Sequence, residues 1–114
     1  MTDCLLCKIR DGQIPATITY RDEDVLAFKD INPRAPFHQL IVPLKHIASL
    51  ATAGAEDAEL LGKLMLAGTH LVREAGYADA GFRVVMNAGR EAGQTVFHIH
   101  LHVLAGRALG WPPG

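Results

Sequence analysis

The sequence predicts an α+β fold, an antiparallel sheet of about five strands with one long helix and a short N-terminal helix. The 114 residues are 49% hydrophobic and 20% charged, which is typical of one globular domain. Five strand-like segments surround one stretch of helical period, and no strand–helix–strand alternation repeats. No linker, internal repeat or low-complexity tract divides the chain, so we expect a single domain over residues 1–114.

The first part of the chain favours a short helix and then three strands. Residues 4–10 are predicted to form one or two helical turns that end at Asp11-Gly12. The predicted strands cover residues 17–20, 25–30 and 38–42. The first two strands form a hairpin, and Pro43 closes the third.

The second part begins with the long helix, predicted over residues 55–75. Apolar residues recur there at spacings of three and four, acidic residues crowd the first turn, and Gly76 stands at the C-cap position. Two further strands are predicted at residues 82–86 and 96–104.

The charge balance limits the classes of partner. Eleven Lys and Arg against twelve Asp and Glu leave a formal net charge of −1, which favours neither nucleic acid nor an anionic membrane. No apolar run is long enough to span a bilayer, and the N-terminus lacks the apolar core of a signal peptide. We expect a cytoplasmic protein.

Three of the six histidines alternate with apolar residues between Phe97 and Val103. On a strand, His98, His100 and His102 would share one face, about 6.5–7 Å apart. Imidazole in such a row can bind metal, move protons or attack an electrophile, whereas the plain alternative is the polar face of an edge strand. The polar, glycine-containing loop before the row, residues 87–95, can cradle phosphate oxygens with its backbone N–H groups.

Cys4 and Cys7 form a second constellation, since a CxxC pair supplies half of a tetrahedral zinc site. A redox pair and two plain buried thiols are the alternatives.

The stretch Gly93-Gln-Thr-Val-Phe-His-Ile-His-Leu-His-Val-Leu104 resembles the signature of the histidine triad (HIT) superfamily. The similarity extends to residues 30–36, to His38 and to residues 43–47. The length and the ending Gly110-Trp-Pro-Pro-Gly114 are similar to the Hint branch, the nucleoside phosphoramidases.

The resemblance implies a HIT-like sheet and a nucleotide hydrolase that works through a covalent nucleotidyl-histidine. His100 matches the nucleophile, and His102 matches the donor to a phosphate oxygen. His38 matches a histidine that orients the nucleophile or relays a proton, although it can equally be a satisfied strand residue. Thr95 stands where the branch commonly has serine and is expected to donate to the leaving group.

The resemblance also implies a purine nucleotide site. Asp30 and the backbone of Ile31 match the ribose-binding positions, although Asp30 can instead cap the turn before Asn32. Leu6 and Phe28 match the walls around the base, although either can be ordinary core. The residues expected around the phosphate are Asn87, Gly93, Gln94, Thr95, His100 and His102.

For the cysteines, similar bacterial proteins imply a structural zinc ion held by Cys4, Cys7, His46 and His98. No organic cofactor is expected. His70, within the long helix, has no partner in these motifs and is expected to be a surface or interface residue.

The C-terminal Trp111 is expected to pack on something, because its indole would otherwise be left in water. The resemblance implies a homodimer in which Trp111 approaches the partner's pocket; folding back on its own domain is the alternative.

Other activities compete with phosphoramidate hydrolysis. They are hydrolysis of dinucleoside polyphosphates or acyl-adenylates, a catalytic metal held by the histidine row, and a non-catalytic nucleotide-binding module.

Overall fold

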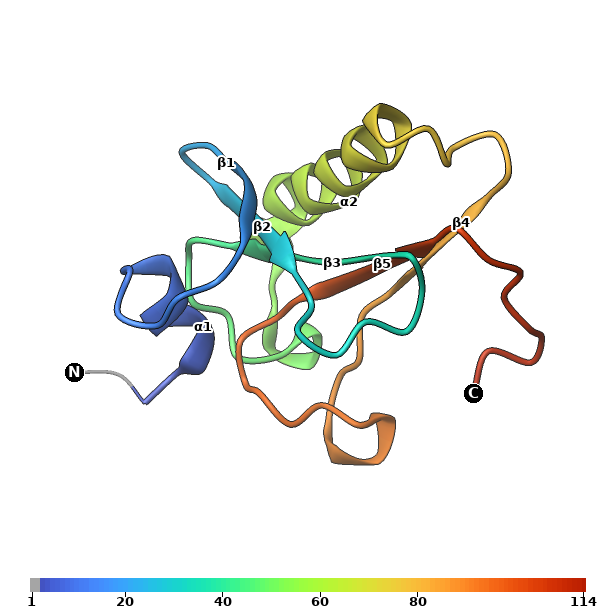
Figure 1. Ribbon diagram of the computed structural model, residues 1–114. Coiled ribbons are helices and arrows are strands. Elements are labelled where there is room, and N and C mark those ends of the chain that lie inside the picture. The colour runs from blue at the N-terminus through green and yellow to red at the C-terminus, as the bar shows by residue number, and fades with distance from the viewer. Residues whose placement is uncertain (1–2) are drawn as a thin grey trace.

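In the computed structural model, which describes residues 3–114, a five-stranded sheet carries a long helix on one face and a short helix near the other (Figure 1). The helices are α1 (Leu5–Arg10) and α2 (Ala58–Glu74). The strands are β1 (Ile18–Arg21), β2 (Val25–Lys29), β3 (Phe37–Pro43), β4 (Phe82–Val85) and β5 (Leu101–Ala105). The order across the sheet is β1-β2-β3-β5-β4, and every neighbouring pair is antiparallel. The predicted α+β class, with its long helix and short N-terminal helix, is confirmed.

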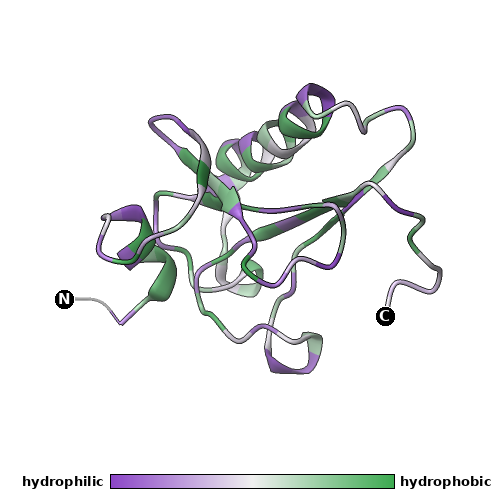
Figure 2. Cartoon of the chain, viewed as in Figure 1, coloured by the Kyte–Doolittle hydropathy of each residue, from purple (hydrophilic) through white to green (hydrophobic). Residues whose placement is uncertain are grey.

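The main core lies between α2 and the sheet. Ile41 of β3 and Val103 of β5 are fully buried there against Leu64 and Val72 of α2. At Gly68 an added Cβ would lie 2.9 Å from Cγ2 of Val103, so the absent side chain lets the helix approach β5 closely. Figure 2 shows hydrophobic colour on the strands and on parts of α2, the elements that enclose this core.

A 3-10 turn, Ala55–Asp57, leads into α2. The Asp57 carboxylate accepts a hydrogen bond from the Gly54 N–H at 3.0 Å and one from Lys45 Nζ at 2.7 Å. Asp57 therefore anchors the start of the helix to the segment that follows β3.

The opposite face of the sheet holds a smaller core cluster with α1. Leu26, Phe28 and Val42 pack there with Leu6 and Ile9. Strand alternation places His38 on this face, and the register pairs His102 with Leu40 of β3. The chemistry predicted for the histidines therefore lies on the α1 face, and α2 covers the other.

The last predicted strand is shorter than expected, because β5 begins at Leu101 rather than at residue 96. Upstream, the Ile99 N–H donates to the Ile47 carbonyl at 2.8 Å, and the Val96 carbonyl accepts from the Gln94 side chain. These bonds lead to loops instead of a neighbouring strand. Phe97, predicted on the apolar face, is consequently 52% exposed.

Within the described part of the chain, neither helix combines the length and the hydropathy that crossing a bilayer requires.

Candidate functional site

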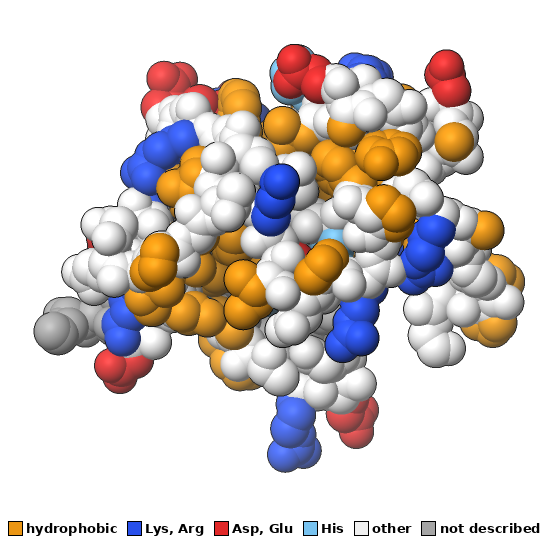
Figure 3. Space-filling model, in the orientation of Figure 1, with side chains coloured by type: hydrophobic (Ala, Val, Ile, Leu, Met, Phe, Trp, Pro, Cys, Tyr) orange, Lys and Arg blue, Asp and Glu red, His pale blue; other side chains and the backbone are white. Residues whose placement is uncertain are grey.

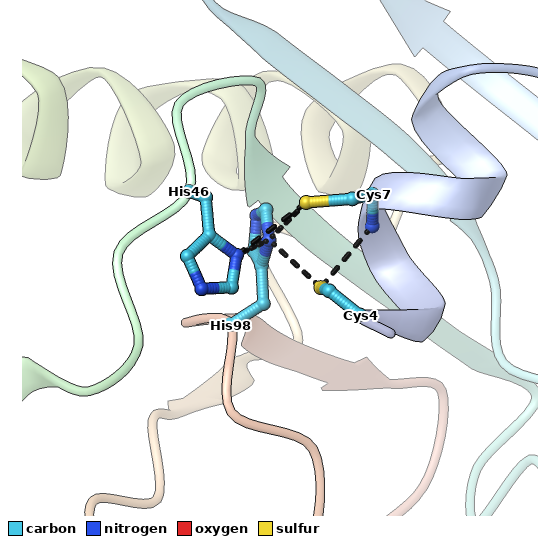
Figure 4. A group of neighbouring side chains, drawn as sticks. All are labelled: Cys4, Cys7, His46 and His98. Carbon is cyan, nitrogen blue, oxygen red and sulfur yellow. Dashed lines mark hydrogen bonds between the residues drawn. The ribbon is translucent and has the colours of Figure 1, made fainter. Parts of the chain in front are cut away.

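Four side chains from three distant segments meet beside α1 (Figure 4). Cys7 extends from α1, Cys4 precedes that helix, His46 follows β3, and His98 precedes β5. Cys4 also caps α1, because its Sγ accepts a hydrogen bond from the Cys7 N–H. The local folding of α1 thus turns both sulfurs toward the two imidazoles.

The ligand atoms have the spacing of a tetrahedral zinc site. His98 Nδ1 lies 3.3 Å from Cys4 Sγ and 3.4 Å from Cys7 Sγ, while His46 Nδ1 lies 3.4 Å from Cys7 Sγ and 3.1 Å from His98 Nδ1. Usual zinc bond lengths place tetrahedral ligands about 3.3 Å apart for two nitrogens and about 3.6 Å for nitrogen and sulfur. The Cys₂His₂ donor set therefore fits zinc.

The protonation of His98 also suits a metal ligand. His98 Nε2 lies 2.9 Å from the Pro43 carbonyl, which can only accept, so the ring proton is on Nε2 and Nδ1 is free for a metal. Burial is the main cause that lowers the pKa of His98, which keeps the ring neutral. Burial likewise raises the pKa of Cys7 in the protein without metal.

The four ligands are not equally enclosed. His98 and Cys7 are buried, whereas His46 is exposed and Cys4 is half-buried. A hollow of about 460 Å³ borders Cys4 and His46 and is lined also by Asp3, Thr95 and Phe97. One side of the cluster is therefore accessible from solvent.

His100 lies two residues beyond His98 but faces a different space. Its Nδ1 lies 2.9 Å from the His98 carbonyl and therefore donates to it. This tautomer places the ring's other nitrogen, Nε2, away from the His98 carbonyl and leaves it for an incoming group. His98 thus joins the Cys₂His₂ cluster through its ring and fixes the tautomer of His100 through its carbonyl.

His100 lines a mostly apolar pocket of about 190 Å³ on the α1 face. Four other residues predicted for the nucleotide line it too: Leu6, Phe28, Asp30 and Ile31. The remaining wall residues, which the sequence did not single out, are Leu5, Ile9, Ile14, Pro15, Ala16, Lys29, Leu40 and Val96. The helical period of α1 was a usable signal for Leu5 and Ile9; the others are brought in by the tertiary fold. Figure 3 shows hydrophobic side chains gathered on this face between α1 and the centre of the molecule.

His38 and His102 form a separate network behind the pocket. The Arg34 N–H donates to His38 Nδ1 at 3.0 Å, so the proton of neutral His38 is on Nε2. That atom lies 3.0 Å from His102 Nδ1 and 3.3 Å from a carboxylate oxygen of Asp30. His102 Nδ1 therefore accepts, and its own proton is on Nε2. Burial is the main cause that lowers the pKa of both histidines, so both are neutral near pH 7.

The positions of Asp30, His38 and His102 would also suit a metal ion, but the protonation pattern does not. His38 would have to ligate through Nε2 while its Nδ1 still accepts from the backbone, which requires an imidazolate. The three triad histidines do not converge on one point either. The ring of His98 contacts the cysteine sulfurs, and the ring of His100 donates a hydrogen bond to the His98 carbonyl. The arrangement favours proton positioning over a catalytic metal.

Asp30 has the turn role that the sequence left open, because its Oδ1 accepts from the Asn32 N–H at 2.8 Å. The other oxygen faces His38, and the carboxylate is 16% exposed. Ile31, which follows it, is 90% exposed.

The residues expected around the phosphate are not equivalent. The N–H groups of Gly93 and Gln94 donate within their own loop, to Arg90 and Gly89, instead of pointing to a free cradle. The Gln94 side chain is buried and fully engaged with backbone groups. Asn87 is half-buried and Thr95 is exposed.

Two remaining expectations concern the surface. Trp111 is 82% exposed, so it does not fold back on its own domain, and the C-terminal tail runs away from the sheet (Figure 1). His70 is on the surface of α2 and pairs with Glu74 at 2.9 Å.

Comparison with known proteins agrees with this geometry. Residues 11–109 match the family model described as the HIT domain. An uncharacterised HIT-like protein of Synechocystis is 49% identical over 112 residues, which are 98% of this chain and 97% of that protein.

Two solved structures are informative. A HIT family hydrolase from Legionella pneumophila has a TM-score of 0.96 and 46% identity, covering 98% of this chain and all of that one. A zinc-bound histidine triad family protein from Mycobacterium smegmatis has a TM-score of 0.80 and 32% identity, covering 98% and 80% of the two chains.

Proposed function

Because the chain belongs to the HIT family, we propose that it hydrolyses purine nucleoside 5′-phosphoramidates through a nucleotidyl intermediate on His100. His100 Nε2 attacks the α-phosphorus, and the bond from phosphorus to the leaving amine breaks as the phosphorus–nitrogen bond to His100 forms. Water then cleaves that bond, which releases the nucleoside monophosphate and restores the imidazole.

The observation that carries the proposal is the tautomer and position of the His100 ring. Its Nδ1–H is held by the His98 carbonyl while the ring lines the apolar pocket. A neutral imidazole fixed in this way presents a lone pair without first losing a proton, as a nucleophile near neutral pH requires.

His102 supplies the complementary donor. Because its Nδ1 accepts from His38, the proton on Nε2 is available to a non-bridging oxygen of the phosphate, where charge grows in the transition state. His38 thereby acts as a positioning residue. Thr95 is proposed to donate to the departing amine, and Asn87 and the loop beside it to contact the phosphate.

The pocket walls support a purine nucleoside. Leu6 and Phe28 offer apolar surface for the base, and Asp30 lies at the edge of the same pocket. The Asp30 carboxylate can accept from both ribose hydroxyls if it gives up its contact with His38. The wall provides no charged or amide side chain apart from Lys29 and Asp30, so adenine and guanine are both accommodated.

Zinc is proposed as a structural ion at Cys4, Cys7, His46 and His98. When bound it ties α1 to the segment that carries His98, and it takes no part in the reaction. Four protein ligands fill a tetrahedral shell and leave no position for substrate.

A twofold homodimer is proposed as well. The exposed Trp111 and the edge position of β4 both offer surface to a second copy. Trp111 would then line the leaving-group side of the partner's pocket.

The decisive experiment is mass spectrometry of the protein after brief mixing with adenosine 5′-phosphoramidate. A nucleotidyl adduct on His100 is expected in wild-type protein. His100→Ala should fold normally, form no adduct and lose at least about a thousandfold in kcat. Near wild-type turnover in that variant would refute the covalent mechanism.

Leaving groups are compared in the same assay. Faster cleavage of a diadenosine polyphosphate or an acyl-adenylate than of the phosphoramidate would reassign the substrate. Tight AMP binding without turnover of any of the three would identify a nucleotide-binding module.

A further inference from the structure

Gln94 lies next to the residues proposed to act on the phosphate, yet its side chain points inward and is only 3% exposed. Its Oε1 accepts from the Gly89 N–H at 2.9 Å, and its Nε2 donates to the Ala48 carbonyl at 2.7 Å and to the Val96 carbonyl at 3.1 Å. All three partners are backbone groups. Reversing the amide would set Oε1 against two carbonyl oxygens, so the orientation is determined by the partners.

The three partners belong to three segments that build the site. Gly89 opens the loop 89–94, Ala48 lies two residues after the metal-site residue His46, and Val96 begins the stretch that leads to His100. No regular ladder joins these segments, because β5 begins only at Leu101.

The loop itself is closed by the same residue. The Gln94 N–H donates to the Gly89 carbonyl at 3.0 Å, while Gly89 donates back to the Gln94 side chain. Gly89 has φ of 87°, a conformation that glycine adopts readily. Both polar groups of the Gly89 backbone are thus held by one glutamine.

We propose that Gln94 is a positioning residue for catalysis: it clamps the loop 89–94 against the segments of His46 and His100, and does not contact the nucleotide with its side chain. This inference rests on the proposed hydrolysis. It assigns Gln94 an indirect role in place of the direct phosphate contact that the sequence suggested. Catalysis requires the phosphate groups and the nucleophile to be held within fractions of an ångström, and the clamp joins the two halves of that arrangement.

The test is the isosteric variant Gln94→Glu. It keeps an acceptor for Gly89, but it removes the donor and sets a carboxylate oxygen against the carbonyls of Ala48 and Val96. We expect kcat/KM for adenosine 5′-phosphoramidate to fall about 100-fold at pH 8. Most of this loss should be in kcat, because the misplaced loop stabilises the transition state less well.

The pH profile separates positioning from a general loss of structure. Protonation of the new carboxyl restores one donor, so the deficit relative to wild type should shrink as the pH falls from 8 to 5. Ala80→Glu is the matched control, because it adds the same charge to an exposed turn residue between α2 and β4, outside the loop 89–94. It should change kcat/KM less than about threefold, an electrostatic effect at a solvent-exposed site.

Two results would overturn the inference: wild-type kcat/KM in folded Gln94→Glu, or a deficit that is the same from pH 5 to pH 8. If Gln94→Glu does not fold, Gly89→Ala strains the same closure at its other end, because Gly89 has a positive φ. Full activity in that variant would equally refute the clamp.

The outcome is separable from the proposed function. If the wild-type protein turns over no phosphoramidate, hydrolysis fails, and the clamp is then tested by AMP affinity in the same variants. Gln94→Glu should weaken AMP binding about tenfold at pH 8, and unchanged affinity would reject it.

Discussion

His98 and His100 are two residues apart and have different tasks. The ring of His98 is buried among sulfur and nitrogen atoms, whereas the ring of His100 lines the apolar pocket. Alternation along a strand predicted that both would share a face. The backbone from Val96 to His100 is irregular instead, and this allows each imidazole its own direction.

Replacing Cys4 and Cys7 together with serine tests the metal cluster at the residue scale. The wild-type protein purified without chelators should contain about one zinc per chain, and the double variant should contain none. We expect the melting temperature of the variant to fall clearly, because metal binding stabilises the fold. The kcat per folded molecule should change little, because the proposed zinc takes no part in the chemistry. Elemental analysis, calorimetry and kinetics measure the three quantities.

The matched control is His70→Ala, which removes a histidine of the α2 surface that belongs to no cluster. It should keep its zinc. Wild-type protein with two reduced thiols and no detectable zinc would contradict the assignment.

At the scale of elements, the start of α2 depends on a carboxylate. Hydrogen bonds from Lys45 and from the Gly54 N–H hold the pKa of Asp57 below its usual value near 4. A carboxylate with a lowered pKa stabilises the fold above the pKa that it has in the unfolded chain. This contribution is lost as the pH falls through the pKa of the folded state.

Asp57→Asn should therefore lower the melting temperature at pH 6. The difference between wild type and variant should begin to shrink as the pH is lowered toward 3, because the pH then falls below the pKa that Asp57 has in the unfolded chain. Thermal unfolding monitored by circular dichroism across this range measures the difference. A gap that stays constant down to pH 3 would show that the charge of Asp57 is immaterial.

The elements also show how far the sequence could be interpreted. Helical spacing predicted α2 because its apolar stripe is long, and turn residues predicted the hairpin of β1 and β2. The start of β5 was predicted five residues too early, since alternation at residues 96–100 is identical in a strand and in a segment that bonds to loops. Only the contacts of Gln94 and Ile47 reveal the difference, and they join residues about 50 positions apart.

The same limit applies to the candidate site. The resemblance supplied the residue types at His100, His102 and the metal cluster, but it could not supply tautomers. These depend on the Arg34 N–H and on the carbonyls of Pro43 and His98. Every residue type except proline carries the same backbone N–H and carbonyl groups, so the sequence does not show which of them will bond to a histidine.

At the scale of the whole molecule, the C-terminal tail tests the proposed dimer. Removing residues 111–114 should change the preference among leaving groups more than the preference between adenine and guanine, because Trp111 is proposed to reach the partner's pocket on the side of the amine. Adduct formation on His100 should persist. Light scattering and competition between phosphoramidates of different amines measure the two effects.

Arg107→Ala is a suitable control, since this arginine contacts the backbone of Arg34 and Ala108 upstream of the tail. It should leave the leaving-group preference unchanged. A wild-type monomer at micromolar concentration, or the same selectivity after truncation, would rule out a contribution from the partner.

The division of the sheet into two faces has a practical consequence for labelling and immobilisation. Cys4 and Cys7 belong to the proposed zinc site, so cysteine chemistry is unsuitable for attaching a probe to the wild-type protein. Leu66 on α2 is 69% exposed and lies on the helix that covers the face away from His100. A fluorophore introduced there through a non-cysteine handle, or a surface tether at that position, would leave both the cysteines and the pocket beside His100 untouched.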